Sequence, residues 1–200
     1  MFFYLSLYPA NTDIRLAYVA NGTLLGGTIE VYDIQLNKIA EGFNPLTIRL
    51  PKGLFIAKFI GTDGYTDYKC ITVYDPDEAK IDNVLIGYRS IETFTNPRFV
   101  VNRTQTIDAR VFGDLYYFIL DIPTLRDYLI EFYDGDRKID ELYIPNHVLR
   151  TISEALYNKV KEAKILLEQY DKDVRTTILL FLGIPYRIEN KALKILNEIV

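Results

Sequence analysis

The sequence predicts an α+β protein: an antiparallel β-sandwich of one or two tandem β modules, followed by a C-terminal segment of about three helices. Two patterns carry this prediction. Up to residue 145, short β-branched and aromatic runs alternate with Gly, Pro, Asn and Asp at intervals typical of antiparallel sandwiches. Beyond Pro145, apolar residues recur at steps of three and four, which is the period of a helix that packs by one face.

The expected β-sandwich domain covers residues 1–90. Asn21-Gly22 lies between two apolar runs and predicts a hairpin, because both residues tolerate positive φ. Residues 54–60 are apolar on both faces, which is typical of a central strand. The expected strands are residues 2–8, 14–19, 28–33, 46–50, 54–60, 69–74 and 84–88.

A series of turn and strand residues in this domain is similar to a known family. The series is Gly-Thr-Ile-Glu-Val (27–31), Gly-x-x-Pro-Leu (42–46), Leu-Pro-Lys-Gly (50–53), Gly64-Tyr65 and Ile-Thr-Val (71–73). In this order, residues 26–73 resemble PEGA-type and carboxypeptidase-regulatory-like domains, which are prealbumin-like β-sandwiches. The resemblance implies a non-catalytic module for adhesion, scaffolding or partner contact. Members usually belong to exported or membrane-anchored proteins, whereas this chain shows neither a signal nor an anchor.

One hairpin-sized stretch occurs twice. Residues 28–45 align with residues 129–145, with one residue fewer in the second turn, and eight of the fourteen aligned positions are identical. Two interpretations follow. In a true duplication, residues 107–145 form a second, shorter β module joined to the first by a linker, 91–106. Otherwise the same strands extend a single sheet, and the similarity reflects only the usual composition of hairpins.

The remaining segment, residues 146–200, is expected to be helical. Its apolar stripe predicts a long amphipathic helix over 147–170 and shorter helices over 173–182 and 188–199. Such stripes usually face a core, so we expect these helices to pack on one another and on the sheet. The alternative is a segment for oligomerisation or docking.

Composition excludes several classes of protein. A single Cys and a single His exclude an intrachain disulfide framework and a Cys/His zinc site. The turn carboxylates lack the order of a calcium loop, and neither a metal nor a cofactor is expected. A net charge of −4 gives no general attraction to nucleic acid. The sequence shows no basic signal-peptide region and no apolar run near the roughly 20 residues that a spanning helix needs. We therefore expect a cytoplasmic or virion-associated protein, and the depletion of Trp, Met and Cys is typical of a thermophile.

The sequence holds no recognisable catalytic arrangement. His147 is the only candidate triad base, and Ser153, six residues on, would not face it on a helix. Cys70 lies within an expected strand and is predicted to be buried. Residues 22–28 have the glycine spacing of a phosphate loop but lack its lysine, so a hairpin is favoured.

The candidate contact residues for a ligand or partner lie in the loop of residues 61–68. They are Asp63, Tyr65, Asp67 and Tyr68. Tyrosines in such loops contact sugars or proteins, although a Tyr more often anchors its own sandwich corner. The sequence thus predicts a non-catalytic structural or interaction protein whose partner is another copy or an assembly partner, for example in a virus of a thermophilic host. The alternative is a carbohydrate-binding or carbohydrate-acting protein that uses loop tyrosines and turn carboxylates; nucleic acid is not expected.

Overall fold

The computed structural model describes residues 2–78, 80–151, 162 and 165. Across 2–78 and 80–151, every regular element is a strand except one 3-10 turn, Asn146–Val148. The predicted α+β class is therefore wrong, because this part of the chain is nearly all β. The expected helices at 173–182 and 188–199, and most of that at 147–170, lie outside the described residues. The helix expected from His147 does not begin there: Leu149 is buried in a sandwich core, and Arg150 forms a β-bridge with Lys80.

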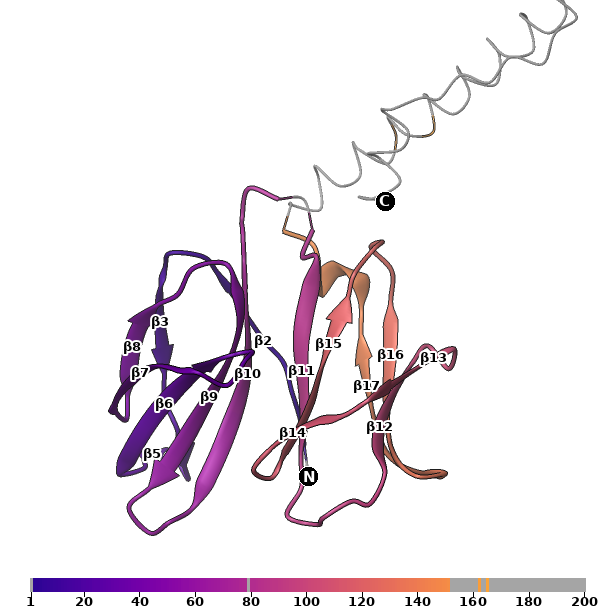
Figure 1. Ribbon diagram of the computed structural model, residues 1–200. Coiled ribbons are helices and arrows are strands. Elements are labelled where there is room, and N and C mark those ends of the chain that lie inside the picture. Colours follow the sequence, from indigo (N-terminus) through magenta and orange to yellow (C-terminus); the bar gives the residue numbers. More distant parts are fainter. Residues whose placement is uncertain (1, 79, 152–161, 163–164, 166–200) are drawn as a thin grey trace, which may run out of the picture.

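The strands form four stacked sheets (Figure 1). The first sheet pairs β3 (Asp13–Leu16) with β8 (Leu46–Arg49). The second has the order β2 (Ser6–Pro9), β10 (Thr66–Tyr74), β9 (Gly53–Gly61), β6 (Gly27–Asp33) and β7 (Lys38–Phe43). The third has the order β1 (Phe2–Tyr4), β11 (Asn83–Arg89), β15 (Leu115–Asp121) and β14 (Arg110–Phe112). The fourth has the order β13 (Gln105–Asp108), β12 (Pro97–Val101), β16 (Tyr128–Asp134) and β17 (Arg137–Ile144). Strands β4 (Val19–Ala20) and β5 (Thr23–Leu24) form a separate short hairpin that pairs with none of these four sheets.

Three apolar cores fill the spaces between the four sheets. The first core lies between the first and second sheets, and the last core lies between the third and fourth. A smaller middle core joins the two sandwiches back to back. Strand β9 contributes Phe55 and Phe59 to the first core and Ile56 to the middle core. This confirms the prediction that residues 54–60 form a central strand that is buried on both faces.

The N-terminal residues cross from one sandwich to the other. Strand β1 pairs antiparallel with β11 in the third sheet, while β2 pairs parallel with β10 in the second. The chain thus changes sheets at Leu5, which packs against the last core. The two sandwiches are held together by backbone pairing as well as by the middle core.

The chain changes sandwich earlier than the sequence indicated. Strand β11 follows the turn after β10 and already belongs to the third sheet, although the first domain was expected to run to residue 90. The expected linker, 91–106, contains β12 and the first residues of β13. The reason is that Phe99 and Val101, within this largely polar stretch, are buried in the last core.

The two similar sequence stretches form equivalent hairpins, β6–β7 and β16–β17. Each pair of strands shifts register at the same aligned position, between Val31 and Tyr32 in one and between Phe132 and Tyr133 in the other. In each hairpin two glutamates face each other directly across the strands, where like charges repel. One lysine lies between each pair: Lys38 Nζ is 3.1 Å from Glu30 and 2.7 Å from Glu41, and Lys138 Nζ is 2.6 Å from both Glu131 and Glu141.

The similarity extends to sheet geometry but not to chain order. In both sheets the repeated hairpin pairs through its first strand with the first strand of a second hairpin, β9–β10 or β12–β13. The second hairpin follows the repeated one in the second sheet and precedes it in the fourth. The repeat is thus a hairpin in a similar sheet, and the two sheets are not copies in the same chain order.

Leu149 belongs to the last core. Its side chain is 0% exposed in the last core, and its carbonyl accepts the N–H of Ile81 at 3.0 Å. Leu149→Ala is therefore expected to lower the free energy of unfolding by about 2–5 kcal/mol, as measured by urea denaturation. Val148→Ala, at a neighbouring side chain that is 37% exposed, is the matched control. Equal stability of the two variants would contradict this assignment.

Candidate functional site

Three of the four predicted contact residues line one pocket. Asp63, Tyr65 and Asp67 face a cavity of about 290 Å³, here called the Tyr65 pocket. Its other lining residues are Tyr18, Val19, Ala20 and Leu25. The β9–β10 loop therefore forms one wall of the pocket, and the β4–β5 hairpin with its flanking residues forms the other.

Local hydrogen bonds fix both walls of the Tyr65 pocket. In the β9–β10 loop, the Asp63 Oδ1 atom accepts the Tyr65 N–H at 3.0 Å, and Gly64 adopts a φ of +82°, which favours glycine. In the opposite wall, Asn21 and Gly22 both have positive φ, which confirms the hairpin predicted at these residues.

A partly buried polar network connects the pocket to the neighbouring strands. Asp67 Oδ1 accepts the Tyr4 hydroxyl at 2.8 Å and the Tyr68 N–H at 2.8 Å. Arg89 donates from Nη1 to the Tyr65 hydroxyl at 3.0 Å and from Nε to Asp114 at 2.8 Å. The Arg89 guanidinium also lies 5.1 Å from the centre of the Tyr65 ring, which is a cation–π distance. Burial and the hydrogen bond to Asp67 raise the pKa of Tyr4, so this hydroxyl stays protonated and donating.

Tyr68, the fourth predicted contact residue, points into the protein. Its side chain is 2% exposed and belongs to the middle core, where its ring lies 5.8 Å from that of Phe112. Burial raises the pKa of Tyr68 to about 12. The ring joins the two sandwiches and is not available to a ligand.

A second pocket, which the sequence did not reveal, adjoins the first. This Ile91 pocket has a volume of about 260 Å³ and is lined by Phe2, Tyr4, Arg89, Ser90, Ile91 and Glu92. Its rim is strongly apolar, since Ile91 is 88% exposed and Phe2 is 71% exposed. The two pockets are separated by the side-chain contacts from Tyr4 to Asp67 and from Arg89 to Tyr65. The only sequence signal was an isolated isoleucine in a polar loop.

The chemistry of the Tyr65 pocket is that of a hydrogen-bond acceptor with apolar walls. Its two ionisable carboxylates, Asp63 and Asp67, each use Oδ1 in the interactions above, while their Oδ2 atoms accept no hydrogen bond from the described residues. Within that same part of the chain, no three His, Cys, Asp or Glu side chains gather closely enough to hold a metal ion. Binding of a donor-rich or cationic group is therefore the chemistry that this pocket supports.

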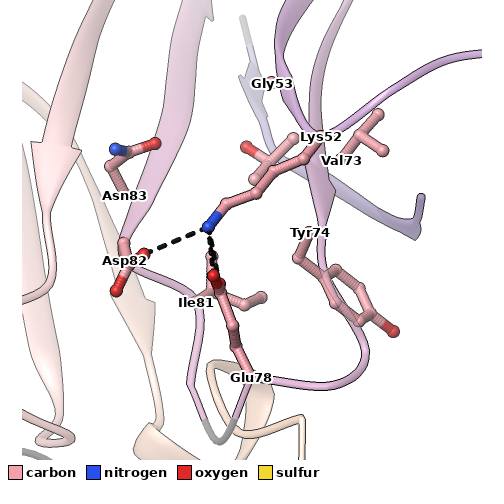
Figure 2. Close-up of a pocket in the computed structure, with 9 residues that line it drawn as sticks. Lys52, Gly53, Val73, Tyr74, Glu78, Ile81, Asp82 and Asn83 are labelled. Atoms are coloured by element: carbon pink, nitrogen blue, oxygen red, sulfur yellow. Dashed lines mark hydrogen bonds and ion pairs between the residues drawn. The ribbon is translucent and has the colours of Figure 1, made fainter.

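A third pocket, of about 270 Å³, lies between the turn before β9 and the connection from β10 to β11 (Figure 2). The Lys52 ammonium points at two carboxylates there, 2.6 Å from Glu78 and 3.3 Å from Asp82. Asp82 also lies 3.1 Å from Lys80. Lys52 and Lys80 thus form ion pairs with Glu78 and Asp82, and these ion pairs help to fix the connection between the two sandwiches.

The contribution of Asp82 to the stability of this connection depends on pH. The hydrogen bond from Lys80, followed by that from Lys52, holds the pKa of Asp82 below its ordinary value of 3.8. Its stabilising contribution is therefore present at neutral pH and is lost as the pH falls below about 4, through the folded-state pKa. Because the carboxylate is half exposed, we expect Asp82→Asn to cost less than about 1 kcal/mol at pH 7 and less at pH 2.5 than at pH 7.

Urea denaturation at both pH values checks this expectation. Asp108→Asn is the control, because Asp108 is an exposed carboxylate on β13 for which no ion pair is found among the described residues. An Asp82→Asn effect of the same size at both pH values would contradict the role of the charge.

Comparison with known proteins adds little to this geometry. No protein-family model matches the sequence, and no curated protein matches it. Among solved structures, the chain is similar to fibronectin(III)-like modules of Clostridium thermocellum CbhA, with 13% identity and a TM-score of 0.25 over 70% of this chain and 87% of that one. It is also similar to Dpr2 Ig1-Ig2 in complex with DIP-Theta Ig1-Ig3, with 11% identity and a TM-score of 0.24 over 71% of this chain and 60% of that one.

Similarity at this level assigns neither a family nor a function. The β-sandwich implied by the PEGA-type resemblance is present, as the strand pairing shows, while membership of that family stays a prediction. The described residues include no helix long and apolar enough to cross a membrane.

Proposed function

We propose that this chain is a non-catalytic interaction protein that binds a protein partner at the surface formed by the Tyr65 and Ile91 pockets. The observation that carries the proposal is the concentration of exposed apolar side chains around these pockets. Their exposed fractions are 88% for Ile91, 71% for Phe2, 54% for Val19, 44% for Leu24 and 44% for Tyr65. Apolar groups that cluster beside a concave surface are characteristic of interaction sites.

The fold supports this role because the surface is assembled from both sandwiches. The Tyr65 pocket is built on β9, β10 and the β4–β5 hairpin, and the Ile91 pocket on β1 and the end of β11. The middle core and the crossing N-terminal residues fix these elements relative to one another. A pre-formed surface of this kind loses little conformational entropy when a partner binds.

The serine that lines the Ile91 pocket and the single cysteine of the chain also favour binding over catalysis. Ser90 is 3% exposed, and its Oγ accepts the N–H of Glu92 at 3.0 Å, which stabilises the loop. Cys70 is fully buried, and burial raises the pKa of its thiol, so a reactive thiolate does not form. Neither residue is prepared as a nucleophile.

Photo-crosslinking in the native cells tests the proposal. A benzophenone amino acid placed at Ile91 or at Val19 should form adducts with a polypeptide, either a second copy or another protein. The same group at Thr47, which is exposed on β8 in the first sheet, is the control. Adducts at Ile91 and Val19 no more abundant than at Thr47 would refute the proposal.

Carbohydrate binding is the second candidate function. It is favoured by one observation: the half-exposed Tyr65 ring lies in the same pocket as the Asp63 and Asp67 carboxylates. An aromatic ring can pack on the C–H face of a sugar while carboxylates accept its hydroxyl groups. A glycan array should then show binding that Tyr65→Ala abolishes and Phe43→Ala, at an exposed aromatic on β7, does not. Equal binding by both variants would exclude this site.

A further inference from the structure

We infer that the partner supplies an extended peptide segment, which places a basic side chain in the Tyr65 pocket and a large apolar side chain in the Ile91 pocket. This inference rests on the proposed function and names the chemistry of the partner. The argument uses the charge of the first pocket, the apolar rim of the second and the contacts that separate them.

The Tyr65 pocket is complementary to a lysine or arginine side chain. The two lining side chains of an acidic residue type are Asp63 and Asp67, no basic side chain lines the pocket, and the Oδ2 atoms of both aspartates are without a hydrogen-bond donor among the described residues. Val19 and Leu25 provide an apolar wall for an aliphatic stem. One neighbouring cation, Arg89, already pairs with Asp67, since its Nη1 lies 3.4 Å from Asp67 Oδ1, and it also contacts Asp114 and the Tyr65 hydroxyl. Asp63 is therefore the pocket carboxylate for which no ion pair is found among the described residues, and Lys69 lies over the Tyr18 ring at 5.2 Å.

The Ile91 pocket has a different preference. Phe2 and Ile91 form its rim and leave most of their apolar surface in water. Covering such surface is worth about 25 cal/mol per Å². A leucine, phenylalanine or similar side chain would bury it, whereas a hydroxyl-rich sugar would leave its own polar groups without partners.

The separation of the pockets fits a single short segment. Tyr4 lines the Ile91 pocket and donates its hydroxyl to Asp67 of the Tyr65 pocket. Arg89 likewise lines the Ile91 pocket and contacts Tyr65. One layer of side chains therefore divides the two cavities, and an extended chain that rises about 3.3 Å per residue reaches from one to the other within a few residues.

Immobilised synthetic peptides provide the test. Each acetylated peptide carries one arginine and one leucine, separated by one to four Gly or Ser residues, and a matched set carries citrulline, the neutral isostere, in place of arginine. The full chain should bind the arginine peptides at one preferred spacing. Binding should weaken with added salt and should be much weaker for the citrulline set.

Four variants of the full chain locate the binding. Asp63→Asn keeps the Oδ1 acceptor of the loop and should weaken binding about fivefold, while Ile91→Ser should weaken it about tenfold. Asp108→Asn and Phe43→Ser, an exposed acid on β13 and an exposed apolar residue on β7, should leave binding unchanged.

The possible outcomes are distinct. Equal binding of arginine and citrulline peptides, or no effect of Ile91→Ser, would overturn the inference. Binding to glycans that depends on Tyr65 and is not shared by any peptide would overturn it in favour of carbohydrate. Polypeptide adducts at Ile91 without binding of any peptide in the set would overturn this inference alone and leave the proposed interaction role standing.

Discussion

Replacing Phe132 with alanine is expected to lower the free energy of unfolding by about 3–5 kcal/mol. Phe132 lies on β16, is 0% exposed and is the centre of an aromatic cluster in the last core. Its ring stacks on Tyr88 at 4.4 Å and contacts Phe99 at 5.0 Å and Phe94 at 5.3 Å. Truncation leaves a cavity bordered by rigid rings, which can collapse only partly.

Urea denaturation of the full chain measures this effect. The control is Phe43→Ala on β7, since the Phe43 ring is 85% exposed and its loss should change stability by less than about 0.5 kcal/mol. Phe43 belongs to the equivalent hairpin, so a difference between the variants reports burial rather than hairpin type. A loss below about 1 kcal/mol for Phe132→Ala would mean that the third and fourth sheets do not pack as described.

Gly87→Ala should destabilise the protein by about 1–3 kcal/mol, because the middle core has no room for another carbon. A Cβ atom on Gly87 would lie 2.5 Å from Cys70 Sγ and 2.8 Å from the Leu115 side chain. Cys70 comes from the second sheet, while Gly87 and Leu115 belong to the third. The added methyl would therefore force the two sandwiches apart or force neighbouring side chains into strained positions.

A double-mutant cycle separates this clash from other effects of Gly87→Ala. In a Cys70→Ala background the sulfur is absent, so the further loss caused by Gly87→Ala should be smaller than in the natural chain. Gly26→Ala is the control, since a Cβ there meets only Thr62 at an ordinary distance of 3.6 Å. Additive losses in the cycle would show that Gly87 and Cys70 do not meet across the middle core.

Much of the local structure was predictable because it depends on neighbouring residues. Asn21-Gly22 identified a hairpin, and the doubly apolar run 54–60 identified a central strand. The assignment of strands to sheets was not predictable, because it depends on contacts between distant residues. In the sequence, β11 follows the first sandwich directly and is therefore predicted to belong to it. In the structure it pairs instead with β15 of the third sheet. Leu149 fitted a helical stripe equally well, since one apolar residue every three or four positions does not reveal which surface it packs against.

Only part of the candidate site could be predicted from the sequence. Asp63 and Tyr65 could be identified because a loop rich in Gly and Asp exposes its side chains. Tyr68 and Cys70 are two residues apart on β10, so their side chains lie on the same face of the strand, toward the middle core. The sequence alone does not reveal that this face is covered by a second sandwich. The Ile91 pocket could not be identified, because Phe2 reaches Ile91 only through the pairing of β1 with β11.

The crossing N-terminal residues have a consequence for biosynthesis. Ser6 pairs with Ile71, and Phe2 pairs with Arg89, so β1 and β2 lack partners until the chain has been synthesised through β10 and β11. Contacts between such distant residues slow folding, because a long loop must close before they form. Until then the edges of β10 and β11 are open to strands from other nascent chains. The residues that join the sandwiches in the finished protein are therefore where its assembly is most exposed to error.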